Sequence, residues 1–506
     1  MNAVAVEPTL STGSPSLRTL LRGLVAEPLL VQIPDQAITG LSLDSRKVLS
    51  GSVFLAVPGL QSHGMDYAIQ AVRNGATVVL WQPTAARVAL TIPNARCVSI
   101  PQLSDLLGVL ADRFYAQPSA HLRIAAVTGT NGKSTTAYLL AAAAQYCGIA
   151  AGYSGTVGYG RLNALQTATH TTPDVVSMHR QLAELRDTGA LAVGMEVSSH
   201  ALHQARIAAV RIDTAVFTNL SRDHLDYHDT MQAYGDAKAM LFNVPELRHR
   251  VVNADDVFGR ELASRNSTAS ITTLYSCDAS FNASRLVQAR EVRLSEAGLQ
   301  LQLAGSFGAA TLRSALLGRF NAENLLAALA VLLGWDVPMS KAVQALEQAV
   351  APPGRMELLS GGNKRVVIDY AHTPDALQKA LQVLKAHCRG QLICVFGCGG
   401  DRDPGKRAAM GAIAAAGADQ VIVTNDNPRN EDPQQIITAI QAGMGDYPVI
   451  IQPDRALAIE QALAMAHADD MVLIAGKGHE DYQLVGTHTH HFSDREVVQA
   501  CLSGAA

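Results

Sequence analysis

Short runs of apolar residues alternate with amphipathic stretches along most of this chain, a pattern that is typical of α/β proteins. In the middle of the chain, near-continuous apolar strands are predicted at residues 124–127, 191–195 and 214–217. Strands that are apolar on both faces suit a parallel sheet covered by helices on each side, so we predict an α/β fold with doubly wound sheets. Four more such strands are predicted at residues 366–368, 392–396, 420–423 and 471–474.

The same pattern divides the chain into three predicted domains. Residues 1–104 form a small α/β domain, residues 105–350 a central P-loop domain with a parallel sheet, and residues 351–506 a Rossmann-like domain. The break before the third domain falls at residues 351–354, where two prolines and a glycine stop any helix. In the first domain, strands are predicted at residues 53–57 and 77–80, with a helix at residues 67–74.

Composition and charge exclude several classes of function. With 506 residues, of which 48% are hydrophobic and 17% charged, the chain is too long for one core and resembles an ordinary globular protein. A net charge of -4 gives no general attraction to nucleic acid or to anionic membranes. No apolar run of about 18 residues and no basic, apolar leader is visible. We therefore expect a cytoplasmic monomer that enters no membrane.

The seven cysteines, an odd number, do not make a disulfide framework. Cys394 and Cys398 invite a metal-site interpretation, but no second cysteine or histidine pair follows at the spacing of zinc ligands. We interpret them as a buried pair at the end of a strand.

A glycine-rich loop connects the strand at residues 124–127 to a predicted helix at residues 134–146. Its glycines allow backbone N–H groups to close round phosphate oxygens, and Lys133 can reach the β- and γ-phosphates. The usual motif has a glycine where this chain has Val127, so the loop is a variant form. The alternative is a structural glycine turn with a solvated lysine, which the strand–loop–helix context disfavours. ATP binding is predicted for Gly129, Thr130, Asn131, Gly132, Lys133, Ser134 and Thr135.

Six motifs occur in the order found in one enzyme family. They are TGTNGKST at 128–135, EVSSH at 196–200, TNLSRDHLDYH at 218–228, GRFNAEN at 318–324, GRME at 354–357 and DYAHTP at 369–374. Together these motifs resemble the Mur ligases, and the resemblance spans nearly the whole chain. The family implies three domains, which bind a UDP-sugar, ATP and the incoming amino acid.

Three further motifs resemble the Mur ligases that add meso-diaminopimelate to UDP-MurNAc-L-Ala-D-Glu during peptidoglycan precursor synthesis. They are GCGGDRD at 397–403, DNPR at 426–429 and GKGHE at 476–480. The resemblance implies that ATP phosphorylates the D-Glu carboxylate and that the amine then attacks the acyl phosphate. The alternatives are a lysine-adding Mur ligase, a folylpolyglutamate synthase, or a scaffold protein with a nucleotide switch. The DNPR tetrad argues against the lysine enzyme, and a switch needs no metal-binding set.

Two anions must meet in this reaction, so metal ions and cationic side chains are required. The resemblance therefore implies ATP and Mg²⁺ as cofactors. It gives catalytic roles to Lys133, Lys238, His224 and Arg355. The implied Mg²⁺ ligands are Ser134, Glu196, His224 and Lys238, the last as a carbamate because a bare ammonium would repel the metal.

For the nucleoside, Asn321 and Asn324 share one face of a predicted helix and suit an adenine edge, while Asp369 suits a ribose hydroxyl. The alternative for Asn321 is a helix N-cap. Pro352 and Pro353 lead us to expect that the third domain closes and carries Arg355 onto the γ-phosphate.

The resemblance assigns the other two substrates to two sets of residues. UDP-MurNAc-dipeptide is assigned to Leu43, Ser45, Gln61, Ser62, Thr171, Thr172, Ser198, Gln204 and Arg206. Diaminopimelate is assigned to Arg402, Asp426, Asn427, Pro428, Arg429, Gly476 and Glu480. The arginines can hold its carboxylates and the acidic residues its ammonium groups, although Asp426 alone has a structural alternative. His170 stands where these relatives often carry asparagine, and it receives no role.

Overall fold

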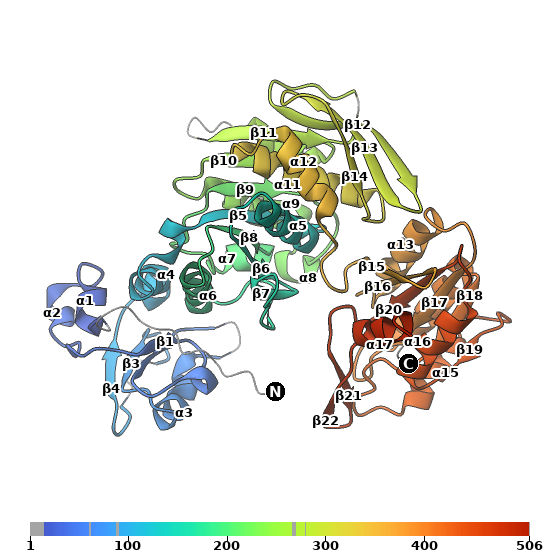
Figure 1. Cartoon of the computed structure of the whole chain (residues 1–506). Helices are drawn as coiled ribbons and strands as arrows, with labels where there is room; N and C mark the ends of the chain where they lie inside the picture. Colours follow the sequence, from blue (N-terminus) through green and yellow to red (C-terminus); the bar gives the residue numbers. More distant parts are fainter. Residues whose placement is uncertain are drawn as a thin grey trace. The chain divides into compact units, whose positions relative to one another are not determined.

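The computed structural model describes residues 15–59, 62–87, 91–168, 170–265, 270–278 and 280–504 (Figure 1). These residues form α-helices and largely parallel sheets, as predicted. Backbone contacts divide the chain into two compact units. The first unit holds residues 1–129, 149–215 and 222–248, and the second holds residues 130–148, 216–221 and 249–506. The domain boundaries expected at residues 104 and 350 stay predictions.

The N-terminal sheet consists of four parallel strands in chain order. They are β1 (Gly40–Ser42), β2 (Ser52–Ala56), β3 (Val78–Trp81) and β4 (Arg96–Ser99). The helices of this region are α1 (Leu17–Leu21), α2 (Glu27–Leu30), α3 (Ala68–Arg73) and α4 (Leu103–Phe114). Neighbouring strand residues face opposite sides, so Val53 and Leu55 pack with α1 and α4, whereas Phe54 and Ala56 pack with α3.

The central sheet has ten strands. They are β5 (Arg123–Thr128), β6 (Ala151–Gly155), β7 (Gly158–Arg161), β8 (Ala192–Glu196), β9 (Thr214–Phe217), β10 (His249–Asn253), β11 (Ile271–Ser276), β12 (Leu286–Ser295), β13 (Gly298–Gly305) and β14 (Ala310–Ser314). Their order is β14-β13-β12-β11-β10-β9-β5-β8-β6-β7. The parallel centre was predicted, but the antiparallel β7, β13 and β14 were not. The second half of β12 is largely exposed and therefore lacks the apolar run that identifies a buried strand.

Eight α-helices accompany this sheet within the described residues. They are α5 (Lys133–Tyr146), α6 (Val175–Asp187), α7 (Ser199–His203), α8 (Leu225–His228), α9 (Met231–Ala239), α10 (Val257–Ser264), α11 (Phe320–Gly334) and α12 (Met339–Gln348). Helix α5, the first of these eight, packs against α11, the longest of them (Figure 1). Both are apolar nearly all round and mostly buried, as a helix inside a core must be.

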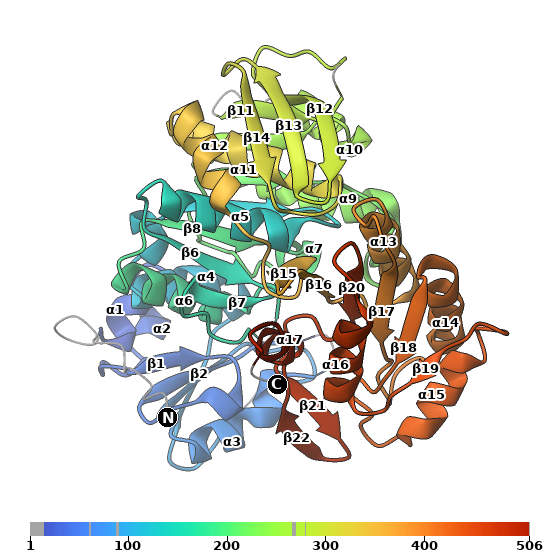
Figure 2. The ribbon, with the colours of Figure 1, turned by 45° about the vertical axis from the view of Figure 1, so that its right-hand side comes forward.

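The C-terminal sheet has six strands, and only its edge strand β15 is antiparallel. The strands are β15 (Glu357–Gly361), β16 (Lys364–Asp369), β17 (Leu392–Phe396), β18 (Gln420–Val423), β19 (Ile450–Ile451) and β20 (Met471–Ala475), in the order β15-β16-β20-β17-β18-β19. The helices are α13 (Pro374–Lys385), α14 (Gly405–Gly417), α15 (Pro433–Gln441), α16 (Arg455–Met465) and α17 (Asp494–Leu502). Helices α13 to α15 cover one face of the sheet, and α16 and α17 cover the other (Figure 2). This is the predicted doubly wound arrangement.

A separate two-stranded hairpin, β21 (Tyr482–Val485) and β22 (His488–His491), follows this sheet. Its first strand pairs with Arg429, whose N–H donates to Leu484 O at 3.0 Å. Cys394 and Cys398 are buried, and burial raises their pKa values to about 12 and about 11. The interpretation as a buried pair is therefore confirmed. No helix among the described residues is long and apolar enough to cross a membrane.

Candidate active site

The glycine-rich loop connects β5 to α5, and hydrogen bonds to Asn219 hold its shape. Gly132 has a φ of 83°, in the left-handed region that glycine adopts without strain. Thr130 N donates to Asn219 O at 2.8 Å, and Asn131 N donates to Asn219 Oδ1 at 2.9 Å. Lys133 Nζ curls back to donate to Thr130 O at 2.9 Å. The loop is thus shaped before any phosphate arrives, and the N-terminus of α5 adds partial positive charge there.

The two predicted adenine residues lie beside this loop. A Cβ on Gly132 would lie 2.4 Å from Asn324 Oδ1. This oxygen accepts a hydrogen bond from Thr136 Oγ1 at 3.1 Å. Asn324 Nδ2 donates to Asn321 Oδ1 at 2.8 Å, so the two amides form one buried pair. The N-cap of α11 is Arg319, and the alternative role of Asn321 as the cap is therefore wrong.

Glu196 is the last residue of β8, and its buried carboxylate is held in a fixed orientation. Oε1 accepts from the Tyr153 hydroxyl and from Thr156 N at 2.8 Å, and Oε2 accepts from Thr156 Oγ1 at 3.2 Å. A Cβ on Gly155 would lie 2.1 Å from Oε1, so only glycine leaves room for it. Thr156 Oγ1 also lies 3.0 Å from Oγ1 of Thr171, which links this carboxylate to a predicted substrate residue.

Lys238 is buried in α9 and reaches the first residue of the phosphate loop. Its Nζ donates to Gly129 O at 2.8 Å and lies 4.2 Å from the centroid of the Tyr234 ring. The partly exposed His224 lies near the same tyrosine, with ring centroids 6.1 Å apart, and packs edge-on against His200. The structure therefore brings two of the predicted catalytic residues to one aromatic ring.

The side chains fit Mg²⁺ only in part. Across the described ranges, no three His, Cys, Asp or Glu side chains converge as a metal site. Mg²⁺ prefers oxygen ligands and is usually held by one or two carboxylates together with substrate phosphates. Glu196 and Ser134 each offer such an oxygen. The ammonium of Lys238 does not, and it would fit only as a carbamate.

Four of the predicted dipeptide residues belong to one hydrogen-bond network. Thr172 Oγ1 accepts from Ser198 N at 3.1 Å and donates to the Glu196 carbonyl at 3.0 Å. Arg206 Nη1 donates to Thr172 O at 2.8 Å, while its Nε and Nη2 donate to Gln204 Oε1 at 3.0 and 2.7 Å. Burial lowers the pKa of Arg206. The network thus holds a half-buried guanidinium in place for an anionic ligand.

The predicted UDP residues lie in the N-terminal region. The Ser45 hydroxyl is buried and donates to Gln70 Oε1 at 2.8 Å. Leu43 packs against the core of the four-stranded sheet, whereas Ser62 is exposed. Gln61 lies outside the described residues, so its role stays a prediction.

Arg355 and Asp369 lie on either side of the first hairpin of the C-terminal sheet. The guanidinium carbon of Arg355 lies 5.0 Å from the Tyr370 ring centroid, and its buried Nε has no hydrogen-bond partner in the described part of the chain. Asp369 Oδ2 accepts from Met356 N at 2.8 Å, and burial raises the pKa of Asp369. An arginine nitrogen without an internal acceptor fits the predicted role in binding phosphate.

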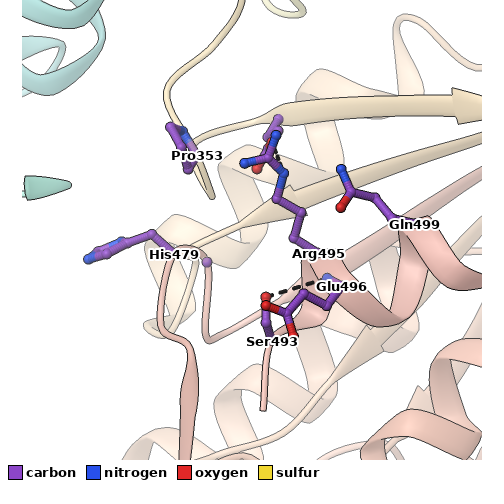
Figure 3. Close-up of a pocket in the computed structure, with 8 residues that line it drawn as sticks. Pro353, His479, Ser493, Arg495, Glu496 and Gln499 are labelled. Atoms are coloured by element: carbon purple, nitrogen blue, oxygen red, sulfur yellow. Dashed lines mark hydrogen bonds and ion pairs between the residues drawn. The ribbon is translucent and has the colours of Figure 1, made fainter. Parts of the chain in front are cut away.

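Gly354 fixes the start of this region against the loop that follows β20. Its φ is 66°, and a Cβ there would lie 2.1 Å from His479 N. Burial and the charge of Arg355 lower the pKa of His479 from 6.5 to about 4. Beside this contact lies a cavity of about 450 Å³, where Figure 3 shows Arg495, Glu496 and Gln499 on α17. Its lining consists of Pro353, Glu357, Gly478, His479, Ser493, Arg495, Glu496 and Gln499, none of them a predicted site residue.

The loops that follow β17 and β18 bring the two predicted carboxylate-binding arginines together. A Cβ on Gly399 would lie 2.8 Å from Arg429 Nη1 and 3.7 Å from Arg402 Cγ. Arg429 Nη1 donates to Gly400 O at 2.7 Å. Pro428 also packs closely against this loop, because a Cβ on Gly400 would lie 1.9 Å from the Pro428 carbonyl oxygen. Glycines at these positions let the tetrad loop approach the preceding loop.

The acidic members of the predicted diaminopimelate set lie across the loops after β18 and β20. Asp426 Oδ2 would lie 2.6 Å from a Cβ on Gly476, and Asn427 Nδ2 donates to Glu480 Oε2 at 3.0 Å. The hairpin strand β21 adds a bond from Gln483 Nε2 to Asp426 O at 2.8 Å. The loops after three neighbouring strands of the C-terminal sheet therefore carry two arginines and two carboxylates of the predicted set.

Three side chains that hold these residues were not predicted. Thr156 follows β6 at its carboxyl end, and the rule that pointed to Glu196 would have found it. Tyr153 gives no signal, because a tyrosine in an apolar strand is ordinarily a core residue. Lys477 lies inside the GKGHE motif, where its neighbour Glu480 drew attention instead.

Comparison with models of known protein families matches three stretches of the chain. Residues 37–115 match the model described as "Mur ligase family, catalytic domain". Residues 127–332 match the "Mur ligase middle domain", and residues 354–478 match the "Mur ligase, glutamate ligase domain".

Curated relatives cover nearly the full length. A protein of Ectopseudomonas mendocina named UDP-N-acetylmuramoyl-L-alanyl-D-glutamate--2,6-diaminopimelate ligase is 48% identical over 90% of this chain and 93% of its own. Proteins with the same name are 46% identical in Pseudomonas aeruginosa, covering 93% and 96% of the two chains, and 48% identical in Xanthomonas campestris, covering 92% and 94%.

Solved structures agree with this result. The structure of a ligase with that name superposes with a TM-score of 0.69 and 35% identity, covering 97% of this chain and 99% of the other. A MurF structure from Acinetobacter baumannii has a TM-score of 0.61 at 19% identity, covers 93% and 95% of the two chains, and supports the fold alone. From its sequence motifs, its three sheets and these relatives, the chain belongs to the Mur ligase family.

Proposed function

We propose that this protein is an ATP-dependent ligase that adds meso-2,6-diaminopimelate to the D-Glu γ-carboxylate of UDP-MurNAc-L-Ala-D-Glu. One observation carries the choice of amino acid, namely that Arg402, Arg429, Asp426 and Glu480 all lie in the loops that follow the neighbouring strands β17, β18 and β20. Diaminopimelate carries an ammonium and a carboxylate at both ends, so its pocket needs both signs of charge. The relatives bearing this activity in their names support the same choice. The nucleotide-linked substrate and ATP fit the cytoplasmic monomer that we expect.

In the first proposed step, the D-Glu carboxylate oxygen attacks the γ-phosphorus of ATP, the bond to the bridging oxygen breaks, and ADP leaves. Catalysis of such a transfer is mostly positioning and neutralisation of charge. The pre-shaped loop and Lys133 would hold the β- and γ-phosphates. Arg355, with its unpartnered Nε, would supply a further cation to the γ-phosphate. Arg206 would hold the substrate peptide by a carboxylate.

Mg²⁺ supplies a counter-charge for the phosphate oxygens when it is bound. Glu196 and Ser134 would offer it oxygen ligands, and His224 stays a predicted ligand from the resemblance. Tyr153 and Thr156 orient the Glu196 carboxylate for that purpose. We propose that Lys238 joins the set as a carbamate: its ammonium releases a proton to solvent, the neutral amine nitrogen bonds to the carbon of CO₂, and a second proton leaves to give the anionic carbamate.

In the second proposed step, one ammonium of diaminopimelate first releases a proton to solvent. The resulting neutral amine attacks the acyl carbon, the bond from carbon to the phosphate oxygen breaks, inorganic phosphate leaves, and the nitrogen releases a second proton to give the neutral amide. Asp426 and Glu480 would receive ammonium groups, while Arg402 and Arg429 would receive carboxylates. L-Lysine lacks one carboxylate, so its binding would leave an arginine desolvated without a partner.

Phosphate release by purified protein with ATP, Mg²⁺ and UDP-MurNAc-L-Ala-D-Glu tests the proposal. We expect release that requires meso-diaminopimelate and that L-lysine does not support. If phosphate is released with L-lysine but not with meso-diaminopimelate, the proposed specificity is wrong. If no phosphate is released with either amine, the proposed ligase function is wrong.

A further inference from the structure

Lys477 is a fully buried lysine in the loop after β20, and it has no assigned role. Its ammonium lies 3.2 Å from Asn427 Oδ1 and 3.4 Å from Glu480 Oε2. The ring of Tyr482 lies 5.4 Å from the same nitrogen. Asn427 and Glu480 both belong to the predicted diaminopimelate set, so this cation contacts two members of that set.

The ammonium determines which way the Asn427 amide points. An ammonium only donates hydrogen bonds, so the atom of Asn427 that faces it must be the oxygen. Leu484 N donates to the same oxygen at 3.0 Å, which reinforces this orientation. The amide nitrogen then faces Glu480 and donates to its Oε2 at 3.0 Å. Without Lys477, the amide would lose one of the two donors that fix it.

Both carboxylate oxygens of Glu480 accept hydrogen bonds, and the side chain is still partly exposed. Lys477 and Asn427 both donate to Oε2, and the Tyr370 hydroxyl donates to Oε1 at 3.5 Å. The Glu480 side chain remains 19% exposed, whereas that of Lys477 is wholly buried. The carboxylate therefore keeps some solvent-accessible surface that a ligand ammonium could contact, whereas the Lys477 ammonium keeps none.

Stability alone does not explain a charge in this place. Burying an ammonium carries a desolvation cost of several kcal/mol, and a buried ion pair often adds nothing to stability over an apolar pair of the same size. The contacts of Lys477 do, however, hold two side chains of the predicted diaminopimelate set in a fixed orientation. The side chains that Lys477 contacts, Asn427 and Glu480, therefore indicate its role better than its burial does.

We propose that Lys477 is a positioning residue for the incoming amino acid. It fixes the Asn427 amide and presents the Glu480 carboxylate to one ammonium group of the amino-acid substrate. This inference rests on the proposed ligase function, because it concerns the amine that the ligase consumes.

The test compares steady-state kinetics of wild type, Lys477→Met and Lys477→Gln. Methionine removes both the charge and the donor, whereas glutamine keeps a donor for Asn427 Oδ1. We expect Lys477→Met to raise the KM for meso-diaminopimelate roughly ten- to hundredfold, the range for a lost hydrogen bond to a charged group. The KM for ATP should stay within about twofold, and Lys477→Gln should recover part of the loss. Lys385→Met, an exposed lysine on α13, is the matched control and should behave as wild type.

A double variant provides a second test of the proposal in case Lys477→Met folds poorly. Lys477→Met with Glu480→Gln leaves no unpaired buried charge and should fold better than the single lysine variant. Its KM for meso-diaminopimelate should match that of Glu480→Gln alone, because Lys477 acts through Glu480. Additive losses in the double variant, or an unchanged amine KM in Lys477→Met, would overturn the positioning role. A wild-type protein that consumes no amine would instead overturn the ligase function.

Discussion

Three buried charged side chains of the candidate site each lie at the end of a strand or contact the loop that follows one. Lys238 and Lys477 are both buried, and each ammonium has oxygen acceptors in place of water. Glu196 is the anionic counterpart, with donors from Tyr153 and Thr156. A buried charge is tolerated only with such partners, so each one fixes the position of at least one neighbouring segment.

Substituting Arg429 with lysine tests the proposed carboxylate contact. Arg429 Nη1 is occupied by Gly400 O, and the rest of the planar guanidinium can still face a carboxylate. Lysine offers one point charge in place of that fork, so kcat/KM for meso-diaminopimelate should fall roughly ten- to hundredfold. Steady-state assays that vary each substrate should show an unchanged KM for ATP. Arg389→Lys, an exposed arginine of the same region, is the control. Equal activity of Arg429→Lys and wild type would remove Arg429 from the pocket.

The lowered pKa of His479 predicts that the folded protein loses stability in weak acid. Its folded-state pKa of about 4 lies below the ordinary value of 6.5, so the unfolded chain binds the proton more readily. The contribution to stability is complete above about pH 6.5 and is lost as the pH falls toward about 4. Thermal unfolding between about pH 7 and pH 5 should therefore lower the Tm of wild type more than that of His479→Gln.

The exposed His491 supplies a control of opposite sign. Its hydrogen bond to Glu496 raises its pKa, so this pair strengthens as the pH falls. His491→Gln should show a slightly steeper acid loss than wild type. Parallel Tm curves for wild type and His479→Gln would contradict the assignment of acid sensitivity to His479.

Residue types at the site were predictable from the sequence, but their partners were not. The motifs pointed to Glu196, Lys238 and Glu480 because each motif is local in sequence. Thr156 lies 40 positions from Glu196, and Asn427 lies 53 positions from Glu480, so only the folded chain shows these pairs. The assignment of Asn321 as a possible N-cap was wrong for a similar reason, because the helix starts one residue earlier than its pattern suggested.

At the scale of elements, the strands that are apolar on both faces were predicted, whereas the buried strands β6 and β10 and the partly exposed strands β12 to β14 were not. The strands Thr214–Phe217, Leu392–Phe396 and Gln420–Val423 have the predicted bounds. Their residues are apolar on both faces because helices cover both sides of the sheet. The strands β12 to β14 mix polar and apolar positions, and their antiparallel pairing depends on contacts that periodicity does not encode.

Gly132→Ala tests whether the start of α5 must be glycine. The new methyl group would require a strained φ of 83° and would lie 2.4 Å from Asn324 Oδ1. We expect a loss of about 1–2 kcal/mol in the free energy of unfolding from the left-handed backbone, and weaker ATP binding by at least about tenfold. Urea unfolding and titration with a fluorescent ATP analogue measure the two effects.

Gly148→Ala, just beyond the other end of α5, is the matched control. Its φ is 79°, and nothing lies within 4 Å of the added Cβ. It should show a similar loss of stability with normal ATP binding. Equal ATP affinity in both variants would show that Gly132 contributes to the backbone turn and not to the nucleotide site.

At the scale of the whole molecule, the three substrates are distributed over different regions of the chain. The predicted UDP residues lie with the four-stranded sheet, the phosphate loop with the ten-stranded sheet and the amino-acid residues with the C-terminal sheet. The four-stranded sheet and the C-terminal sheet each have a hydrophobic core of their own. The proposed chemistry requires the three reacting groups to come within bonding distance, and the division into three domains and their closure both stay predictions.

The prediction at this scale is that substrates draw the regions together about residues 351–353. Gly354 is fixed to the C-terminal region by its contact with His479 N, so any pivot must lie before it. Small-angle scattering should show a smaller radius of gyration with a non-hydrolysable ATP analogue and UDP-MurNAc-L-Ala-D-Glu than without them. Lys133→Ala, which weakens the predicted phosphate contact, should reduce the change at the same ligand concentrations. Because ligands shift a conformational equilibrium only through contacts made in the closed state, an unchanged radius in wild type would mean that closure is not coupled to these substrates.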